Sequence, residues 1–267
     1  MTLSIFDELA TRGHEQVVVF HYPDVGLKAI IAIHSTVLGP ALGGCRLRPY
    51  ESEEQAFDDV LRLAEGMTYK SALAGMPLGG GKACILVDPH FTERRKELFH
   101  QFGRCVESLG GRYVTAEDMG TTEQDIQWLS ESTKHATGRP REVGGAGDPS
   151  PWTALGVYQA ILAASERYFG GKNLAGRKIA VQGVGHVGRY LIEHLVSAGA
   201  EVVVTDTYAP TLEAVVQEFG VRAVAPEEIY DVECDIYSPC AIGQTVNPET
   251  VPRLQCRIIA GAANNQL

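Results

Sequence analysis

A glycine-rich hexapeptide, Gly183-Val184-Gly185-His186-Val187-Gly188, lies between a run of β-branched residues and a segment with helical periodicity. In that setting the first glycine permits a tight turn, the second lets the backbone approach a diphosphate, and the third lets helix and strand pack closely. The N-terminus of the following helix offers free N–H groups and a partial positive charge to phosphates. The sequence therefore predicts a dinucleotide-binding turn.

The next predicted strand ends in Asp206, 23 residues after Gly183. At about that separation an acidic residue accepts hydrogen bonds from the adenosine ribose of a dinucleotide. A carboxylate there would repel a 2′-phosphate, so the pattern favours NAD over NADP. The alternative is that Asp206 is only a turn residue at a strand end.

Strands and helices alternate along the whole chain, which predicts an α/β fold. The second half is expected to be a Rossmann-type, doubly wound NAD-binding domain over 147–267. Its predicted strands are 177–183, 201–206, 221–224, 234–240 and 256–263, and its helices are 151–169, 187–199 and 211–220. Ser150 is the expected N-cap of the first of these helices, since Pro is favoured at the following position.

The first half, 1–146, is expected to be a second α/β domain, separated from the other by the glycine-rich segment 142–150. The β-branched runs and helical spacings predict strands 15–22, 27–35, 82–88 and 112–118, and helices 52–74, 92–111 and one from about 122.

Charge and composition argue for a small-molecule substrate. The net charge is −10 without a Lys/Arg-rich block, which argues against nucleic acid and anionic membranes as partners. No apolar run approaches the roughly 20 residues needed to cross a bilayer, and the N-terminus does not resemble an export signal, so a cytoplasmic protein is expected. The six cysteines have no metal-binding spacing, so reduced thiols and no metal are expected.

Two lysines twelve residues apart, Lys70 and Lys82, flank an apolar stretch that ends in three glycines. A single lysine is usually a solvated surface charge. Lys82, however, is expected between a glycine-rich turn and a buried strand, where desolvation would favour the neutral amine and allow it to act as a base.

Six segments together resemble the glutamate/leucine/phenylalanine/valine dehydrogenase family, and its leucine dehydrogenases most closely. They occur in collinear order over essentially the whole chain. They are GPALGGCRLRPY (39–50), GMTYKSALAGMPLGGGKA (66–83), GRYVTAEDMGTT (111–122), GDPSPWTALGVY (147–158), VQGVGHVG (181–188) and AGAANNQL (260–267).

The resemblance implies NAD-dependent, reversible oxidative deamination of an apolar L-amino acid to its 2-oxo acid and ammonium. By the same resemblance Lys70 binds the substrate carboxylate, Lys82 is the catalytic base that activates water, and Asp118 transfers protons. Asn264 would contact both substrate and cofactor. Further cofactor contacts are implied for Thr153, Cys240 and Ala241. The alternatives are a helix cap for Asp118 and a turn residue for Asn264.

The substrate side chain is expected to be apolar. Glutamate-specific relatives carry a lysine before the glycine pair that corresponds to Gly43 and Gly44, whereas this chain has Leu42. Burying a carboxylate there without a cation would cost several kcal/mol. Ala116 leaves room for a branched chain. Leucine is not separated from valine, phenylalanine or tryptophan, because one methylene contributes only about 1–3 kcal/mol, and Leu42 and Ala116 as plain core residues stay an alternative.

Two other classes of function remain open at this point. One is a non-catalytic dinucleotide-binding relative of the family, because relatives usually continue beyond Leu267 with a further strand and helices that this chain is expected to lack. The other is a hydroxy-acid oxidoreductase, which would use a His, or an Arg paired with a carboxylate, in place of two lysines. Relatives are oligomers, so a homo-oligomer is expected.

Overall fold

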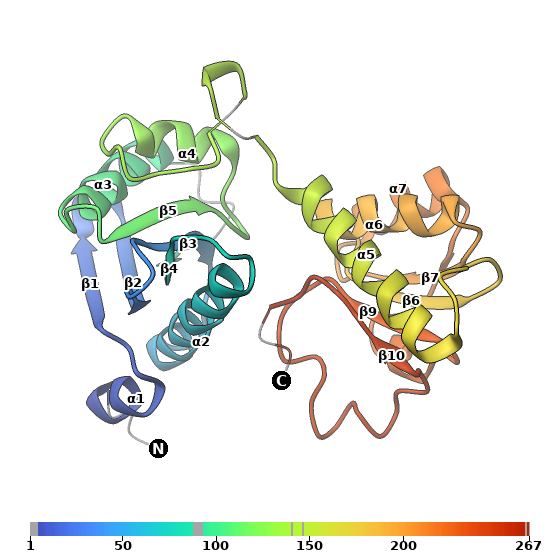
Figure 1. Ribbon diagram of the computed structural model, residues 1–267. Helices are drawn as coiled ribbons and strands as arrows, with labels where there is room; N and C mark the ends of the chain where they lie inside the picture. The colour runs from blue at the N-terminus through green and yellow to red at the C-terminus, as the bar shows by residue number, and fades with distance from the viewer. Residues whose placement is uncertain (1–4, 88–92, 140, 146, 265, 267) are drawn as a thin grey trace. The chain divides into compact units, whose positions relative to one another are not determined.

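The computed structural model describes residues 5–87, 93–139, 141–145, 147–264 and 266 (Figure 1). Contacts divide the chain into two compact units, Met1–Asp148 and Pro149–Leu267, and each is described by itself. Residues 88 and 92, predicted to end a strand and begin a helix, and residues 265 and 267 of the last motif lie outside the described residues. Within the described parts, no helix combines the length and the apolar character that a membrane span requires.

The first unit is a five-stranded mixed sheet between helices, in the order β1-β2-β4-β3-β5. Strands β1 and β2 and strands β2 and β4 are antiparallel, whereas β3 is parallel to both β4 and β5. The strands are β1 (Gln16–Tyr22), β2 (Leu27–Ser35), β3 (Ala41–Arg48), β4 (Gly79–Leu86) and β5 (Tyr113–Glu117). The helices are α1 (Ile5–Arg12), α2 (Glu53–Leu73), α3 (Arg95–Glu107) and α4 (Glu123–Ser130), with 3-10 turns η1 (Pro23–Val25) and η2 (Arg141–Val143).

Both faces of this sheet are buried. Alternate side chains of β2 point to opposite faces, so the strand contributes to a core on each side. Ile31 and Ile33 pack with Phe99 of α3 in one core. Ile30 packs with Val60 of α2 in the other. Each fully buried side chain of this size contributes about 1.5–3 kcal/mol to folding. The sheet therefore holds α2 on one face and α3 and α4 on the other (Figure 1).

Strand β3 is central to the unit and was not predicted. Its glycines and arginines interrupt the β-branched pattern that identifies a strand, but the glycines are what the packing demands. A Cβ on Gly43 would lie 1.6 Å from the carbonyl oxygen of Gly81.

The glycine-rich turn expected before Lys82 was a wrong prediction, because Gly79, Gly80 and Gly81 are the first residues of β4. Bare backbone is needed there for close packing. A Cβ on Gly80 would lie 2.1 Å from the backbone nitrogen of Thr68 in α2. Lys82 consequently lies within a strand.

The second unit is a parallel sheet in the order β10-β9-β6-β7-β8. Its strands are β6 (Lys178–Gln182), β7 (Glu201–Thr205), β8 (Arg222–Ala223), β9 (Ile236–Pro239) and β10 (Ile258–Ile259), and its helices are α5 (Ser150–Phe169), α6 (His186–Ser197), α7 (Ala209–Phe219) and the 3-10 turn η3 (Glu228–Asp231). The order reverses at β6, and ligands of such sheets bind beyond the carboxyl ends of the strands at that point. The predicted α/β fold class with a Rossmann-type domain is confirmed.

Helix α5 begins one residue earlier than predicted. Ser150 is the first helical residue and Pro149 occupies the N-cap, with no side-chain capping bond. The expected end is correct, since Gly170 adopts the left-handed conformation, φ 80°, that ends many helices.

Candidate active site

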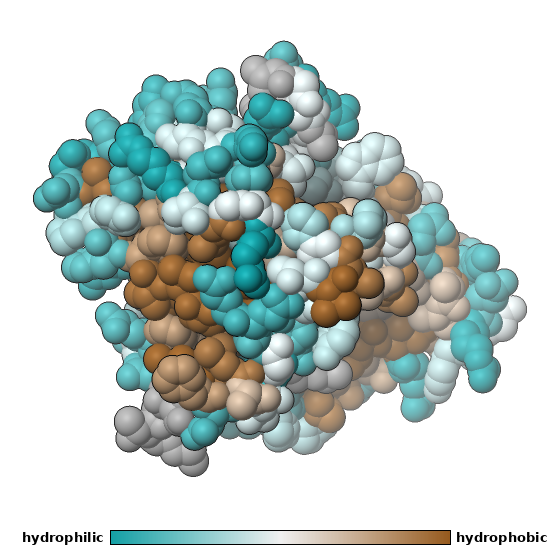
Figure 2. Space-filling model, turned by 60° about the vertical axis from the view of Figure 1, so that its left-hand side comes forward, coloured by the Kyte–Doolittle hydropathy of each residue, from teal (hydrophilic) through white to brown (hydrophobic). Residues whose placement is uncertain are grey.

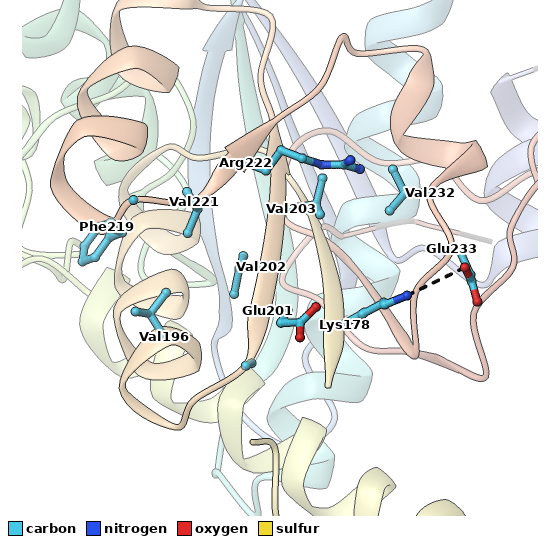
Figure 3. A pocket seen from close by; sticks show the side chains of 12 residues that line it. Lys178, Val196, Glu201, Val202, Val203, Phe219, Val221, Arg222, Val232 and Glu233 are labelled. Atoms are coloured by element: carbon cyan, nitrogen blue, oxygen red, sulfur yellow. Dashed lines mark ion pairs between the residues drawn. The ribbon is translucent and has the colours of Figure 1, made fainter. Parts of the chain in front are cut away.

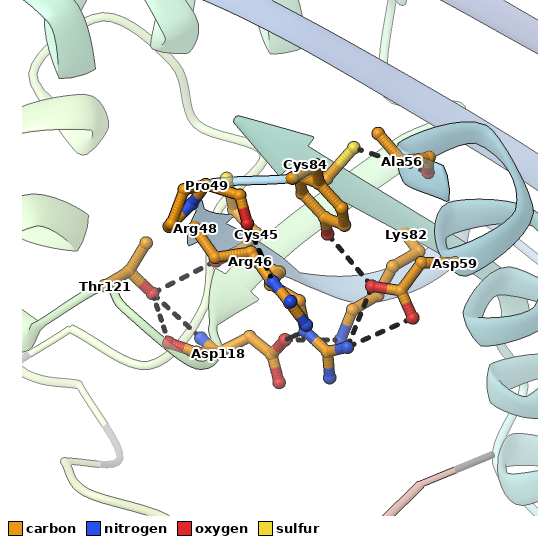
Figure 4. Close-up of polar contacts among 11 residues, drawn as sticks. Cys45, Arg46, Arg48, Pro49, Ala56, Asp59, Lys82, Cys84, Asp118 and Thr121 are labelled. Carbon is orange, nitrogen blue, oxygen red and sulfur yellow. Dashed lines mark hydrogen bonds and ion pairs between the residues drawn. The ribbon is translucent and has the colours of Figure 1, made fainter. Parts of the chain in front are cut away.

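Lys82 and Asp118, two of the candidate site residues, lie together (Figure 4). Lys82 comes from the middle of β4 and is only 4% exposed. Asp118 follows β5 directly, and its Oδ2 lies 3.1 Å from Nζ of Lys82. Burial disfavours the charge of an ammonium group, whereas a carboxylate at this distance stabilises it.

A second cation, Arg46 of β3, binds the same carboxylate oxygen. Its Nε donates to Oδ2 of Asp118 at 2.9 Å. Its Nη1 donates to Oδ2 of Asp59 in α2 at 2.9 Å. The hydroxyl of Tyr50 also donates to that Asp59 oxygen, at 2.9 Å. The sequence analysis missed these three residues, although an arginine between apolar residues in segment 39–50 was an available signal.

Asp118 is ionised at neutral pH. Burial alone would raise its pKa, but the charges and hydrogen bonds of Lys82 and Arg46 outweigh burial and lower the pKa to about 2. A carboxylate of this kind holds cations firmly.

The proposed alternative role of Asp118 as a helix cap is wrong. The N-cap of α4 is Thr122, whose side chain accepts from the backbone of Asp125. Asp125 is itself held by Arg95, with contacts of 2.8 and 2.7 Å. Arg95 also donates to the carbonyl of Gly120 at 2.9 Å. The contacts of Arg95 with Asp125 and Gly120 therefore hold the turn that follows Asp118.

The predicted pocket residues surround this pair on neighbouring strands. Leu42 of β3 and Ala116 of β5 are each half-buried, and strand alternation places Leu42, Ala116 and Lys82 on the same face of the sheet as Arg46. A Cβ on Gly44 would lie 2.5 Å from the carbonyl oxygen of Glu117. The glycine pair thus lets β3 lie close to its neighbours.

Lys70 lies in the last turn of α2 and its side chain is exposed. Partial desolvation of the ammonium lowers its pKa, and the charge of Lys82 lowers it further, partly offset by Asp118. Electrostatic influence from both residues shows that Lys70 belongs to the same charged neighbourhood.

The glycine turn of the second unit is tight at Gly183 and Gly188 and open at Gly185. Gly183 has φ 96°, and a Cβ on Gly188 would lie 2.1 Å from its carbonyl oxygen. A Cβ on Gly185, by contrast, would meet no described atom within 4 Å, so the turn is open at this position. His186 is exposed and Val187 is half-buried against the core.

Asp206 lies beside this turn. Its Oδ2 accepts from the backbone N–H of Val184 at 2.8 Å and its Oδ1 from that of Tyr208 at 2.9 Å. Across the turn, the backbone nitrogen and Cβ of Ala241 lie 2.7 Å from where a Cβ on Gly183 would be. The backbone of Cys240 donates to Gln182 at 2.7 Å.

Two further predicted cofactor residues are placed less specifically. Thr153 is exposed in the first turn of α5, and its hydroxyl donates to the carbonyl of Pro149 at 3.1 Å. Asn264 is half-buried beyond β10 and interacts with other residues of the chain.

Comparison with known proteins identifies the chain. A sequence model of the "Glu/Leu/Phe/Val dehydrogenase, dimerisation domain" matches residues 14–135, and one of the "Glutamate/Leucine/Phenylalanine/Valine dehydrogenase" matches residues 144–212. A leucine dehydrogenase of Bacillus cereus is 52% identical over 267 residues, which cover all of this chain and 73% of that protein. The chain belongs to the glutamate/leucine/phenylalanine/valine dehydrogenase family.

Other members of the family are nearly as similar. A phenylalanine dehydrogenase of Caldalkalibacillus thermarum is 48% identical over 272 aligned residues, covering all of this chain and 73% of that protein. The crystal structure of L-tryptophan dehydrogenase from Nostoc punctiforme, 44% identical, superposes with a TM-score of 0.71 over 98% of this chain and 74% of that one. The protein is therefore an amino-acid dehydrogenase, an oxidoreductase similar to leucine dehydrogenase.

A surface hollow of about 660 Å³ in the second unit is not at the dinucleotide site (Figure 3). It is bordered by Lys178 and Glu201, the first residues of β6 and β7. Lys178 forms an ion pair of 3.7 Å with Glu233 there. The glycine turn of the dehydrogenase follows the opposite, carboxyl end of β6.

Among the described residues, no three or more His, Cys, Asp or Glu side chains form a group that could hold a metal ion. The six cysteines are free thiols.

Proposed function

We propose that this protein catalyses NAD-dependent, reversible oxidative deamination of an apolar L-amino acid, leucine or another branched-chain amino acid, to the 2-oxo acid and ammonium. The observation that carries the proposal is the buried amine of Lys82, 3.1 Å from the carboxylate of Asp118. Lysine is rarely fully buried in proteins, and buried titratable groups with a specific charge partner cluster at functional sites. We assign substrate binding to residues 1–146 and dinucleotide binding to residues 147–267.

Three side chains have distinct tasks in this proposal. Lys70 binds the substrate carboxylate by charge. Lys82 accepts a proton at Nζ from the water that attacks the substrate, after its own amine has been deprotonated. Asp118, with a pKa of about 2, orients the Lys82 amine and attracts the substrate ammonium, and it takes up a proton only transiently.

NAD would be held by the turn from Gly183 to Gly188, with Asp206 facing the adenosine ribose. The open position at Gly185 and the carboxylate beside the turn support this assignment. When bound, the nicotinamide supplies a hydride acceptor for the α-carbon. Contacts from Thr153, Cys240, Ala241 and Asn264 remain predictions, as does the cytoplasmic location.

An apolar substrate is supported by Leu42, because its own side chain offers no cation to a charged substrate group. A leucine dehydrogenase of Bacillus cereus is 52% identical to this chain. The phenylalanine and tryptophan enzymes are also similar, so the same chemistry on an aromatic amino acid is the second candidate.

The proposed function also includes a homo-oligomer. The first unit leaves apolar side chains exposed, among them Phe6 (84%), Val19 (61%) and Val37 (86%). Figure 2 shows apolar surface on this unit. The edge strand β1 carries Val19, and exposed apolar edges favour association with another chain.

A spectrophotometric assay tests the proposal. Purified protein is mixed with NAD or NADP and a panel of L-amino acids that includes leucine, valine, phenylalanine, tryptophan and glutamate. We expect reduction of NAD with the branched-chain substrates and none with glutamate. Binding of NAD without turnover of any amino acid would identify a non-catalytic relative instead.

A further inference from the structure

We propose that Asp59 is a positioning residue that acts through Arg46. Its negative charge balances that of Arg46, so that Asp118 remains the partner that balances the charge of Lys82. This inference rests on the proposed function, because it assigns a role in the same site to residues that touch neither substrate nor cofactor. The observation behind it is that the Arg46 guanidinium lies between two carboxylates from different elements.

Different nitrogens of the Arg46 guanidinium bind the two carboxylates. Nη1 of Arg46 lies 3.2 and 2.9 Å from the two oxygens of Asp59. Nε donates to Asp118 at 2.9 Å, to the same oxygen that binds Lys82. Arg46 and Asp59 are mostly buried, with side-chain exposures of 9% and 22%. Charge-assisted bonds in such surroundings fix orientation as well as charge.

Tyr50 anchors the outer end of this chain of contacts. Its hydroxyl donates to Asp59 at 2.9 Å. Burial, followed by the negative charges around it, raises the pKa of Tyr50, so the hydroxyl stays a donor. The Arg48 guanidinium lies 4.9 Å from the centre of the Tyr50 ring. Asp59 therefore cannot turn away from Arg46 without losing the Tyr50 bond.

Charge balance gives this arrangement its consequence. Arg46 and charged Lys82 face Asp59 and Asp118, so the four groups sum to zero. Without the Asp59 charge, Asp118 alone would face two cations. The surplus positive charge would disfavour protonated Lys82, and Arg46 would bind Asp118 more strongly in competition with it.

Other titratable groups lie near the pair, and one of them titrates near neutral pH. They are Lys70 from α2, Cys45 from β3, Cys84 from β4, Tyr113 and Glu117 from β5, and Asp125 from α4. Burial and acidic neighbours raise the pKa of Glu117 to about 7. A pH experiment must therefore separate Glu117 from Lys82.

The test compares two identical substitutions at adjacent positions of α2. Asp59→Asn keeps the shape and an acceptor for Arg46 but removes the charge. Asp58→Asn is the control, because Asp58 pairs with Arg12 at 2.8 Å and not with Arg46. In Asp59→Asn the acid limb of the kcat/KM profile should move to lower pH by about one unit. We also expect kcat at its optimum to fall about tenfold.

The Asp58→Asn profile should superpose on that of the unmodified protein, and Asp59→Glu should restore the position of the acid limb. The shift should persist when Asp59→Asn is combined with Glu117→Gln. Equal profiles for Asp59→Asn and the unmodified protein, or an equal shift in Asp58→Asn, would overturn the proposal.

A second measurement does not depend on turnover. Competitive labelling with acetic anhydride, followed by peptide mass spectrometry, reports the pH at which the Lys82 amine becomes reactive. That midpoint should fall in Asp59→Asn and stay in Asp58→Asn, even if no amino acid is a substrate. An inactive protein with the expected midpoints would refute the proposed function alone, whereas an unchanged midpoint in Asp59→Asn would refute the role of Asp59.

Discussion

Nζ of Lys82 and Nε of Arg46 meet at one oxygen, Oδ2 of Asp118, at 3.1 and 2.9 Å. The carboxylate thereby holds a group that can release a proton and a group that cannot, since arginine stays charged in proteins. Lys82 can change its charge while Arg46 keeps Asp118 ionised and in place. An oxidoreductase that must move protons at one amine benefits from this asymmetry.

Replacing Lys82 by Ala should abolish deamination and leave NAD affinity nearly unchanged. The loss of a general base typically costs about 10²–10⁴ in rate, and the predicted dinucleotide turn belongs to the other unit. Steady-state rates and fluorescence titration with NADH check the two parts. Lys96→Ala is the control. The Lys96 side chain is exposed, and its amine forms only a surface ion pair with Glu131, at 3.9 Å. Comparable turnover in Lys82→Ala would rule out the base.

Asp206→Ser combined with Thr207→Arg should shift the preference toward NADP. The change removes a carboxylate that would repel a 2′-phosphate and adds a cation next to it. We expect the ratio of kcat/KM values to move by at least about tenfold, or ~1.4 kcal/mol. Asp206→Asn, which retains an acceptor for the Val184 N–H, should show a smaller shift. An unchanged ratio in both variants contradicts the ribose role.

Leu42→Lys should impair use of leucine, because an apolar substrate side chain would then meet a desolvated cation. The loss in kcat/KM should be at least about 100-fold. The matched variant Leu42→Met keeps an apolar group of similar volume and should stay within about tenfold. Equal activity of Leu42→Lys on leucine would remove Leu42 from the substrate pocket.

Glu117→Gln should stabilise the protein above neutral pH. Oε2 of Glu117 is buried without a hydrogen-bond partner among the described residues, and burial with nearby acids raises its pKa to about 7. Because the folded pKa exceeds the ordinary value of 4.5 for a glutamate, the stability that Glu117 contributes is present below about 4.5 and lost as pH rises through about 7.

The gain from Glu117→Gln should be on the order of 1–2 kcal/mol at pH 8 and close to zero at pH 4, after allowance for solvent screening. Urea unfolding at both pH values measures it. A gain of the same size at both would show that charge on Glu117 is not its cause.

Substitution by alanine should have opposite effects on stability at two glycines. Gly43→Ala should prevent folding of the first unit, since its Cβ would lie 1.6 Å from a backbone oxygen. Gly156, within α5, has no described atom within 4 Å of an added Cβ. Gly156→Ala should raise stability by about 0.5–1 kcal/mol, because glycine disfavours helix interiors. Thermal melts of both variants decide, and a folded Gly43→Ala would mean that β3 can move.

The second unit was the more predictable from sequence, because its signals are local. A glycine turn, a strand before it and Asp206 one strand later can be read within a short stretch. The first unit depends on contacts between distant segments. The sequence of β3 does not resemble a strand, because its glycines are explained only by the close approach of Gly43 to Gly81. Helix α1 has no strong sequence signal of its own.

The same difference divides the site. Lys82 and Asp118 were anticipated through motifs that a family shares. Arg46 and Asp59 were not, because an ion pair between a strand and a helix leaves no periodic trace, and Tyr50 gains its meaning only from the Asp59 carboxylate.

The tight spacing of β3 against β4 and β5 has a consequence for how such an enzyme acquires new specificities. Backbone at Gly43 and Gly44 cannot yield without moving the strands that carry Lys82 and Asp118. Substitutions that alter specificity are therefore expected at side chains such as Leu42 and Ala116. An enzyme of this kind can change its amino-acid substrate while Lys82 and Asp118 keep their positions.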